Sequence, residues 1–243
     1  MTTDLSICRD ALNRDPVLYL DLAETVRRGD GKVLGATPRG ALVAFTNLID
    51  GPQFGFTMFA GDLETAEALL ALLPPIPGFI TVHETLYSGL LKERFGFGGM
   101  HACWQVGYLR TTPPTLPDVP NVEVRPLERS HLPTVTANYD LEDEEYLSWL
   151  IGRGEMIGAF DGDSLLAFAG RHAEGSIGLL EVLPQYRRRR LASLLQSHMI
   201  NLELSRGHIP YGQVFDGNEP SLALQRSLGM TQSIGQLYWA TRD

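Results

Sequence analysis

The chain has 243 residues, of which 44% are hydrophobic, and it carries a formal net charge of −9 at pH 7. This length supports one or two domains with proper hydrophobic cores. The acidic balance argues against a nucleic-acid partner, because recognition of a phosphate backbone calls for a basic surface. No apolar run approaches the roughly 20 residues that cross a bilayer, so we expect no membrane partner.

The N-terminal residues and the cysteines predict a cytoplasmic location. The first residues lead into a mixed, acidic segment rather than a basic stretch followed by an apolar one, so no secretory signal is expected. Cys8 and Cys103 lie far apart, which is typical of free thiols in a reducing compartment. The six histidines lack the spacing of metal ligands, and we expect no metal.

The first half of the chain, residues 1–112, predicts a small α/β unit. Residues 79–82 have an apolar strand pattern, and residues 90–95 indicate a helix that ends at Gly96. Residues 103–109 form another apolar strand pattern. No run of basic residues follows these strands, so we expect no phosphate site in this half.

A proline-rich segment divides the chain. Residues 111–120 contain four prolines. Such a segment is extended, and it cannot form a helix or a central strand. We therefore place a linker at residues 113–120 and a second domain, here called the second half, at residues 121–243.

The second half alternates between strand and helix patterns, which is typical of an α/β (α+β) fold. Two helices are expected, one from Leu132 and one over residues 142–151. A turn at residues 161–164 indicates a hairpin. The expected strands cover residues 122–127, 156–160, 165–169, 177–182, 211–215 and 237–240.

Residues 179–193 carry the strongest functional signal. An apolar strand ends at Pro184, four arginines occupy residues 187–190, and apolar residues at helical spacing follow from Leu191. Backbone N–H groups and guanidinium groups therefore converge beside a helix N-terminus, whose dipole favours anions. Arginine forks add bidentate contacts to phosphate. The pattern indicates a phosphate-binding loop; a solvated basic face or a nucleic-acid patch is the alternative interpretation.

A second pattern follows the strand at residues 211–215. Asn218 is a good helix N-cap, Pro220 is tolerated in a first helical turn, and Gly229 suits the C-terminal end of a helix. These residues predict a short helix over residues 222–228.

The two patterns together resemble the GNAT superfamily of N-acetyltransferases. The acyl-CoA loop of that family follows a strand ending Val-x-Pro and contains Arg or Gln, two residues, Gly, one residue, then Gly or Ala. Arg187 and Ala192 take the first and last places, while Arg190 stands at the glycine. That departure matters because glycine is favoured where backbone approaches a ligand closely.

The downstream helix resembles the same family. Asn218, Ser221 and Gly229 match its pattern, while Gln225 replaces a tyrosine and Met230 an aromatic residue. That tyrosine often serves the family as general acid for the departing thiolate, so its role has no evident successor here.

The resemblance implies an acyl-CoA co-substrate, most simply acetyl-CoA, held by the second half alone. It also implies that a backbone N–H near Val182, freed by strand splaying, faces the acyl carbonyl. The cofactor-binding residues that it implies are Leu180, Val182, Arg187, Arg188, Arg189, Arg190, Leu191, Ala192, Ser193, Asn218 and Ser221.

The first half is similar to the second at one place. Residues 90–97 resemble residues 224–230, and in both places one strand comes before and another after. We therefore expect tandem GNAT-like mixed central sheets flanked by helices, with a degenerate first copy on the substrate side; a small α/β cap is the alternative. This layout is similar to the glycine N-acyltransferase-like branch of the superfamily.

Amide formation from a thioester needs an uncharged amine, and Glu181 is the catalytic base that the sequence favours. Strand alternation places Glu181 and Val182 on opposite faces unless a bulge intervenes. The other candidate bases are His172 and Glu174, and the candidates for the missing acid are Tyr211 and Tyr238.

We expect an acyl-CoA-dependent N-acyltransferase that acts on the amine of a small molecule or amino acid, as a monomer or homodimer. The alternative is a non-catalytic acyl-CoA-binding or regulatory protein. The departures at Arg190 and Gln225 favour that alternative.

Overall fold

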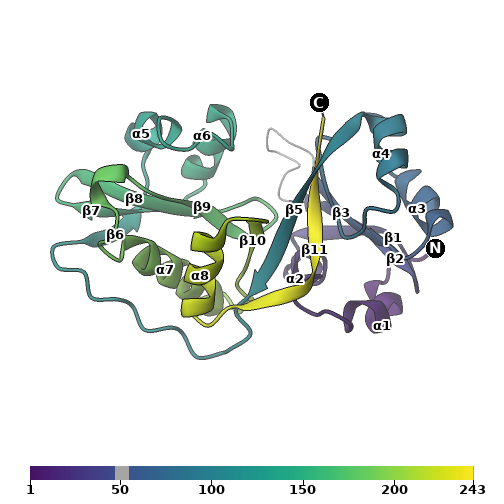
Figure 1. Ribbon diagram of the computed structural model, residues 1–243, viewed down its shortest axis with the longest axis horizontal. Coiled ribbons are helices and arrows are strands. Elements are labelled where there is room, and N and C mark those ends of the chain that lie inside the picture. Colours follow the sequence, from purple (N-terminus) through teal and green to yellow (C-terminus); the bar gives the residue numbers. More distant parts are fainter. Residues whose placement is uncertain (47–54, 243) are drawn as a thin grey trace.

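The computed structural model describes residues 1–46 and 55–242. Within these ranges the strands form two sheets, one in the order β1-β2-β3-β4-β11-β5-β10 and the other in the order β6-β7-β8-β9. Figure 1 shows the first half, in purple and blue, beside the second half, in green, with the long strands β5 and β11 between them. The mixed α/β architecture with flanking helices confirms the predicted fold class.

The first half begins with short helices and continues into a sheet. The predicted strand at residues 79–82 and the helix ending at Gly96 are both confirmed, and Gly96 has the left-handed conformation, with φ 76°, that favours glycine. The elements are α1 (Arg9–Leu12), α2 (Leu20–Arg28), β1 (Gly31–Thr37), β2 (Gly40–Phe45), β3 (Gly55–Ala60), α3 (Leu63–Leu70), β4 (Phe79–Val82), α4 (Ser88–Phe95) and β5 (Phe97–Gly107).

The second half follows the predicted order of strands and helices. Helix α6 begins at Glu144, two residues later than predicted, because the Asp143 carboxylate accepts a 2.7 Å hydrogen bond from the backbone N–H of Tyr146 and caps it there. The elements are β6 (Glu123–Pro126), α5 (Leu132–Thr136), α6 (Glu144–Gly152), β7 (Met156–Asp161), β8 (Ser164–Arg171), β9 (Ile177–Val182), α7 (Leu191–Ser205), β10 (Tyr211–Phe215), α8 (Glu219–Ser227) and β11 (Thr231–Arg242).

The two halves exchange strands. Strand β11 of the second half lies between β4 and β5 of the first half, and β5 in turn pairs with β10. The register places Leu237 opposite Cys103, and Gln213 opposite Gln105. The proline-rich linker contains neither helix nor strand, as predicted. The linker is therefore a boundary in sequence, although the large sheet runs across it, and the division into domains stays a prediction.

Both halves contain the succession strand, helix, strand, helix, strand. In the first half it is β3-α3-β4-α4-β5, and in the second it is β9-α7-β10-α8-β11. The first and third elements of this succession, which are both strands, pair differently in the two halves. Strands β3 and β4 pair in parallel, whereas β9 and β10 belong to different sheets. The separation of β9 from β10 positions the candidate site.

Candidate functional site

Strands β9 and β10 form a V that is closed at one end and open at the other. At the closed end the backbones nearly touch, and a Cβ atom added to Gly212 would lie 2.6 Å from the carbonyl oxygen of Ile177. Only glycine permits this approach. Beyond it, a cavity of about 210 Å³, here called the strand cleft, is lined by β9 from Ile177 to Glu181 and by β10 from Gly212 to Phe215.

A bulge in β9 turns successive side chains toward the strand cleft. Leu179 has a φ of 55°, and the pairing with β8 shifts so that Leu179 and Leu180 stand opposite a single residue. Leu180 and Glu181 both line the cleft, whereas Val182 does not. The bulge thus breaks the strict alternation of side chains along β9. The edge of β9 that faces β10 has no strand partner in the described structure, so its backbone groups are available to a ligand.

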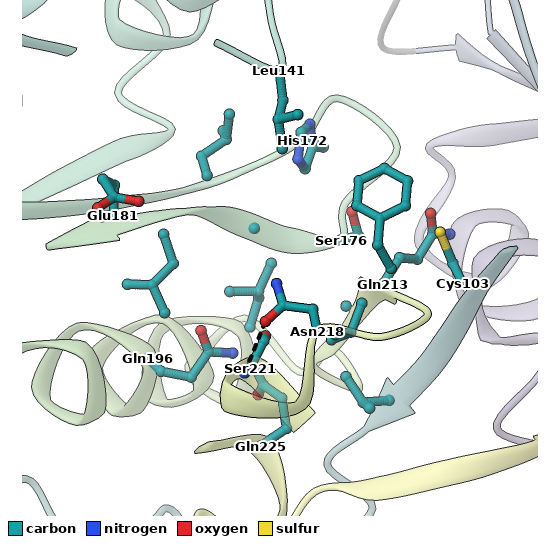
Figure 2. A pocket seen from close by; sticks show the side chains of 18 of the residues that line it. Cys103, Leu141, His172, Ser176, Glu181, Gln196, Gln213, Asn218, Ser221 and Gln225 are labelled. Atoms are coloured by element: carbon teal, nitrogen blue, oxygen red, sulfur yellow. Dashed lines mark hydrogen bonds between the residues drawn. The ribbon is translucent and has the colours of Figure 1, made fainter. Parts of the chain in front are cut away.

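Polar side chains from α7, α8 and β10 form the other wall of the strand cleft. Two of the predicted cofactor-binding residues, Asn218 and Ser221, lie there, with the Ser221 N–H donating to Asn218 Oδ1 at 3.2 Å. Gln196 and Gln225 lie beside them, and Figure 2 shows this group across the cleft from His172. Gln225, which stands where the family has tyrosine, is thus a cleft residue.

Two amide groups of the strand cleft have an unmatched polar atom. Gln213 accepts a hydrogen bond from Trp239 Nε1, but its own Nε2 is buried and has no partner among the described residues. The Oε1 atom of Gln225 is likewise buried without a partner in the described chain. Buried polar groups without partners are costly, so these atoms suit a ligand that carries amide or other hydrogen-bonding groups.

The basic loop between β9 and α7 is built to expose backbone N–H groups. Arg188 and Arg190 have φ values of 62° and 63°, in the left-handed region. No described residue accepts a hydrogen bond from the backbone N–H groups of residues 187–193, and α7 has no side-chain cap. Such alternating conformations and an uncapped helix start form an anion-binding concavity. Leu191 is buried, so its contribution to an anion site comes from its backbone.

The four arginine side chains of this loop are exposed. Arg187 donates to Glu181 Oε1 at 3.1 Å and to the carbonyl oxygen of Val182 at 3.2 Å. Arg189 lies over the ring of Tyr186 at 5.8 Å. Arg187 therefore ties the loop to the end of β9, and it partly neutralises the Glu181 carboxylate that the sequence favours as base.

A second cavity, of about 230 Å³, adjoins the strand cleft and is here called the interface pocket. Phe79 of the first half lines this pocket together with residues of the second half, so both halves contribute to it. Four of its residues, Leu141, Glu142, His172 and Trp239, also line the strand cleft. The complete lining is Phe79, Leu141, Glu142, Tyr146, His172, Glu174, Trp239 and Thr241.

His172 lies where the two cavities meet. Its Nδ1 atom is 3.3 Å from the Tyr146 hydroxyl and 3.7 Å from Glu142 Oε1. Burial raises the pKa of Glu142, an effect that the nearby His172 opposes. Burial also raises the pKa of Tyr146 well above its usual value, so this tyrosine stays protonated. The junction therefore holds an imidazole beside a carboxyl group with a weakened preference for its charged form.

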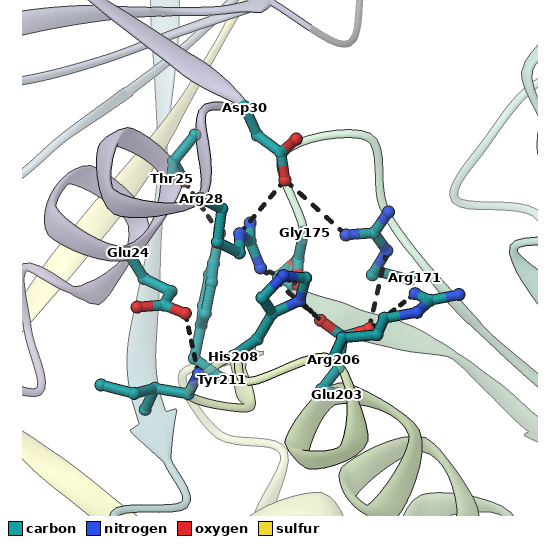
Figure 3. A network of polar contacts seen from close by, with 12 residues as sticks. Glu24, Thr25, Arg28, Asp30, Arg171, Gly175, Glu203, Arg206, His208 and Tyr211 are labelled. Atoms are coloured by element: carbon teal, nitrogen blue, oxygen red, sulfur yellow. Dashed lines mark hydrogen bonds and ion pairs between the residues drawn. The ribbon is translucent and has the colours of Figure 1, made fainter.

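The turn that carries His172 and Glu174 is held by the first half. Arg28 donates to the carbonyl oxygen of Glu174 at 2.7 Å and pairs with Asp30 at 3.1 Å and with Glu203 at 3.7 Å. The Tyr211 hydroxyl donates to the same Glu174 carbonyl at 2.6 Å. Figure 3 shows Arg28 between these groups, beside the Tyr211 ring. The geometry of the junction therefore depends on contacts between the halves.

The two tyrosines considered as replacement acids lie away from both cavities. Tyr211 is fully buried in the polar network just described, and burial raises its pKa. Tyr238 packs against the core of the first half. Neither residue lines the strand cleft or the interface pocket.

Several residues of the two cavities are missed by reasoning from sequence. In the sequence Glu142 is only the start of an expected helix, Gln213 and Trp239 are only residues of expected strands, and Cys103 is only a free thiol. Alternation on β10 could have identified Gln213, whereas Trp239 and Cys103 reach the cleft only through strand exchange. Burial raises the pKa of Cys103 to about 12, so it is a thiol rather than a nucleophilic thiolate. Both cysteines are free, as predicted.

Comparison with known proteins shows a fold that this chain shares with structures of the GNAT family. Residues 156–240 match the family model of FR47-like proteins. A Drosophila protein of known structure has a TM-score of 0.68 and 16% identity, covering 98% of this chain and 94% of that one. A GNAT-family protein from Novosphingobium aromaticivorans has a TM-score of 0.57 and 18% identity, covering 92% and 95%.

A third structure of the same fold is a GCN5-related N-acetyltransferase-like protein from Streptococcus suis. It has a TM-score of 0.54 and 18% identity, and it covers 97% of this chain and 98% of that one. No curated protein sequence matches the chain. At these identities the likeness shows the fold, and the chain accordingly has the GNAT fold over nearly its whole length.

Two further findings concern metal ligands and membrane-spanning helices. Residues 1–46 and 55–242 contain no cluster of three or more His, Cys, Asp or Glu side chains that would hold a metal ion. Over the same residues no helix is long and apolar enough to cross a membrane.

Proposed function

We propose that this protein is an acyl-CoA-dependent N-acyltransferase that acylates the amine of a small molecule, with acetyl-CoA as the simplest donor. One observation carries the proposal: the strand cleft extends from Glu181, the ion-pair partner of Arg187 in the loop with free N–H groups, to His172, where the interface pocket begins. The neighbouring structures named GCN5-related or GNAT support acyl transfer as the chemistry.

The residues present fit an acyl-CoA molecule. The uncapped start of α7 and the backbone of residues 187–193 suit a pyrophosphate, because free N–H groups and the helix dipole favour anions. The unmatched amide atoms of Gln213 and Gln225 suit the amide groups of a pantetheine arm. Asn218, Ser221 and the free edge of β9 complete this wall. When bound, the co-substrate would supply the acyl group as a thioester.

The incoming amine must lose a proton, and two groups are candidates to take it. His172 lies at the junction of the cavities, with Glu142 3.7 Å away to stabilise the imidazolium that forms. Glu181 also lines the strand cleft, but its carboxylate is paired with Arg187. We assign the proton to His172 and keep Glu181 as the second candidate. Gln225 has no acidic proton, so water is the proposed proton source for the thiolate.

The first experiment tests cofactor binding. Calorimetry should show a much higher affinity for CoA than for dephosphorylated pantetheine, because the loop recognises phosphate. Arg187→Ala should weaken CoA binding more than Arg188→Ala, since a hydrogen bond to a charged group contributes about 1.5–3 kcal/mol and Arg187 takes the family's first place. Equal affinity for CoA and pantetheine would sink the proposal, and equal effects of the two substitutions would sink the role of Arg187.

The second experiment separates the two bases. His172→Gln should lower kcat/KM by about 10²–10⁴-fold and remove the acid limb of its pH profile, while CoA affinity is unchanged. Glu181→Gln should leave that limb in place. The opposite result, a lost limb in Glu181→Gln alone, would return the role of base to Glu181.

A non-catalytic acyl-CoA-binding or regulatory protein is the second candidate function. Gln225 favours it, since this cleft residue stands at the place of the family's usual acid. Release of free CoA in the presence of a panel of amines decides between the two functions. If CoA binds and no amine ever stimulates its release, the non-catalytic function is correct.

The remaining expectations are proposals of the same kind. The shared succession of elements, together with the absence of a basic loop after β3, supports a degenerate GNAT-like first half and a glycine N-acyltransferase-like layout. Free, buried cysteines support a cytoplasmic location, and the acidic chain supports a partner other than nucleic acid. A monomer or homodimer is proposed as the active form.

A further inference from the structure

We propose that the interface pocket selects an acceptor that is an organic ammonium ion with an apolar body and no carboxylate group. This selection excludes α-amino acids, although they are the acceptors that a glycine N-acyltransferase-like layout would suggest. The inference rests on the proposed function, because it names the class of amine that the acyltransferase would use.

The charge of the interface pocket is the first argument. Two carboxylates, Glu142 and Glu174, line it, and no described lysine or arginine lines either cavity. A substrate carboxylate would therefore meet two like charges and no cation, which is strongly unfavourable in a partly enclosed site. An ammonium group meets the opposite situation.

Both carboxylates have hydrogen-bonding capacity to spare. Glu174 is 8% exposed and accepts a hydrogen bond from the Ser176 hydroxyl at Oε1, while no described donor reaches Oε2. Glu142 accepts no hydrogen bond from the described residues, and its nearest cationic partner is His172 at 3.7 Å. Arg28 approaches Glu174 only at its backbone carbonyl and is paired with Asp30 and Glu203. Buried charge is unfavourable unless it is paired, so a bound cation would satisfy both groups.

The walls of the pocket are the second, independent argument. The Phe79 and Trp239 rings meet edge to face at 5.1 Å, and Trp239 and His172 do so at 6.3 Å. The Tyr146 ring stacks on His172 at 6.1 Å. Such rings pack against an apolar body, and their faces attract a cation. Phe79 comes from the first half, so the interface between the halves sets the specificity.

The position of the pocket fits the chemistry. His172 and Glu142 line both cavities, so an ammonium group held between the carboxylates lies beside the proposed base. In the net reaction the amide C–N bond forms and the thioester C–S bond breaks. The ammonium nitrogen loses two protons, one to solvent through His172 and one that ends on the thiol sulfur.

Matched acceptor pairs test the inference. Phenethylamine and phenylalanine, or tryptamine and tryptophan, differ only in the α-carboxylate. With acetyl-CoA as donor, we expect kcat/KM from free-CoA release to be at least about 100-fold higher for the amine of each pair. An amino acid that is used as well as its amine, or better, overturns the inference while the proposed transferase function stands.

Two substitutions locate the selection. Glu174→Gln and Glu142→Gln should each raise the KM for the amine by about 10- to 100-fold, because a charged hydrogen bond is lost. Each substitution should also reduce the ratio of kcat/KM for the amine to kcat/KM for the amino acid within each pair. The matched control is Glu144→Gln, an exposed residue of α6 that lines neither cavity. The CoA dissociation constant should be unchanged in Glu174→Gln and Glu144→Gln, because neither residue lines the strand cleft. An unchanged ratio in both pocket variants overturns the inference.

A binding measurement keeps the inference testable if the protein proves not to be a transferase. In that case no acceptor releases CoA from the wild-type protein, and the proposed function fails alone. Calorimetry in the presence of CoA should still detect phenethylamine and should not detect phenylalanine. If neither binds, or if phenylalanine binds more tightly, the inference fails as well.

Discussion

The two halves of the chain differ in how one pair of strands is arranged, and this difference decides where a ligand fits. The pair is β3 and β4 in the first half, which are parallel neighbours, and β9 and β10 in the second half. Strand β3 pairs with β4 from Gly55 opposite Phe79 to Met58 opposite Val82. Strands β9 and β10 approach at Gly212 and then diverge around the strand cleft. One succession of elements therefore gives a closed sheet in one half and a cavity in the other.

A buried polar cluster holds the first half closed. Asp21 of α2 accepts a 2.6 Å hydrogen bond from Thr57 of β3 and a 3.3 Å bond from Thr81 of β4, which lie opposite each other. Its other oxygen is 3.0 Å from His83 Nε2, and both side chains are fully buried. One carboxylate thus bridges the two strands. At the corresponding place the second half has the strand cleft and the unmatched Gln213 amide.

The helices that follow the first strands differ as well. Asp62 caps α3, accepting a 2.7 Å hydrogen bond from the Thr65 N–H, and it pairs with Arg39. Helix α7 begins at Leu191, directly after Arg190, and has no side-chain cap. A carboxylate at the start of α3 occupies the N–H groups and repels phosphate, whereas the start of α7 is open to it. An anion site thus needs an uncapped helix in addition to separated strands.

The largest expected effect follows from removing the strand bridge. Asp21→Ala should lower the free energy of unfolding by about 3–5 kcal/mol, because it leaves the buried His83 and two hydroxyl groups without their partner. Urea unfolding followed by far-UV circular dichroism measures the loss. Asp10→Ala, which removes an exposed carboxylate of α1, is the control and should change stability by no more than about 0.5 kcal/mol. A similar effect of both substitutions would show that Asp21 does not hold the strands together.

The same pair predicts how stability depends on pH. Burial alone would lower the pKa of His83, but the charge and hydrogen bond of Asp21 outweigh it and raise the pKa from the usual 6.5 to about 9. A raised pKa means that the stabilisation is fully present below pH 6.5 and is lost as the pH rises through about 9. The loss should be about 3 kcal/mol at most.

Urea unfolding at pH 6, 7.5 and 9 tests this dependence. The control is His83→Gln, which keeps a polar side chain, removes the titration and leaves the neighbouring Glu84 in place. The wild-type protein should lose stability over this range, and the variant should lose much less. Parallel curves for the two proteins would assign the pH dependence to other groups.

The third prediction gives α7 the acidic start of α3. Arg190→Asp should weaken CoA binding by about 10- to 150-fold, because a carboxylate competes with phosphate for the same N–H groups. Arg188→Asp makes the same charge change in the same loop, at a residue with nearly the same φ, and should have a smaller effect. Calorimetry compares the two. Equal effects would assign binding to the overall charge of the loop rather than to the helix start.

The elements of the second half that depend on local patterns could be predicted from sequence. Residues 177–182 and 211–215 appear in the structure with the predicted bounds, because apolar runs between turn residues define buried strands. The helix that begins after Asn218 and ends before Gly229 follows from capping chemistry. Asn218, Ser221 and Glu181 do reach the strand cleft. Local signals thus predict residues that the structure brings to the strand cleft, and their roles stay a prediction.

Other residues of the two cavities come together through long-range pairing. Strand exchange brings Trp239 and Cys103 to the strand cleft, and no local pattern encodes which half a strand joins. The β9 bulge depends on a left-handed Leu179, a conformation that leucine rarely adopts. Glu142 and Phe79 line one pocket only because the two halves of the chain pack together. These features need the assembled sheet, so sequence periodicity could not reveal them.

The smallest expected effect concerns the strain in the basic loop between β9 and α7. Arg190 occupies the family's glycine place with a φ of 63°. A left-handed residue with a Cβ atom costs about 1–2 kcal/mol, while glycine adds only about 0.5–1 kcal/mol of backbone freedom to the unfolded chain. Arg190→Gly should therefore be about 0.5–1 kcal/mol more stable than Arg190→Ala, although both variants lose the same charge.

Urea unfolding measures this difference, and the same exchange two residues later provides the control. Ala192 lies in the first turn of α7, so Ala192→Gly should be destabilising by about 0.5–1 kcal/mol, with the opposite sign. CoA should bind Arg190→Gly and Arg190→Ala with similar affinity if the loop keeps its shape in both. If Arg190→Ala is as stable as Arg190→Gly, the loop does not hold the left-handed conformation in solution. The difference between the uncapped start of α7 and the capped start of α3 would then depend on the Asp62 cap alone.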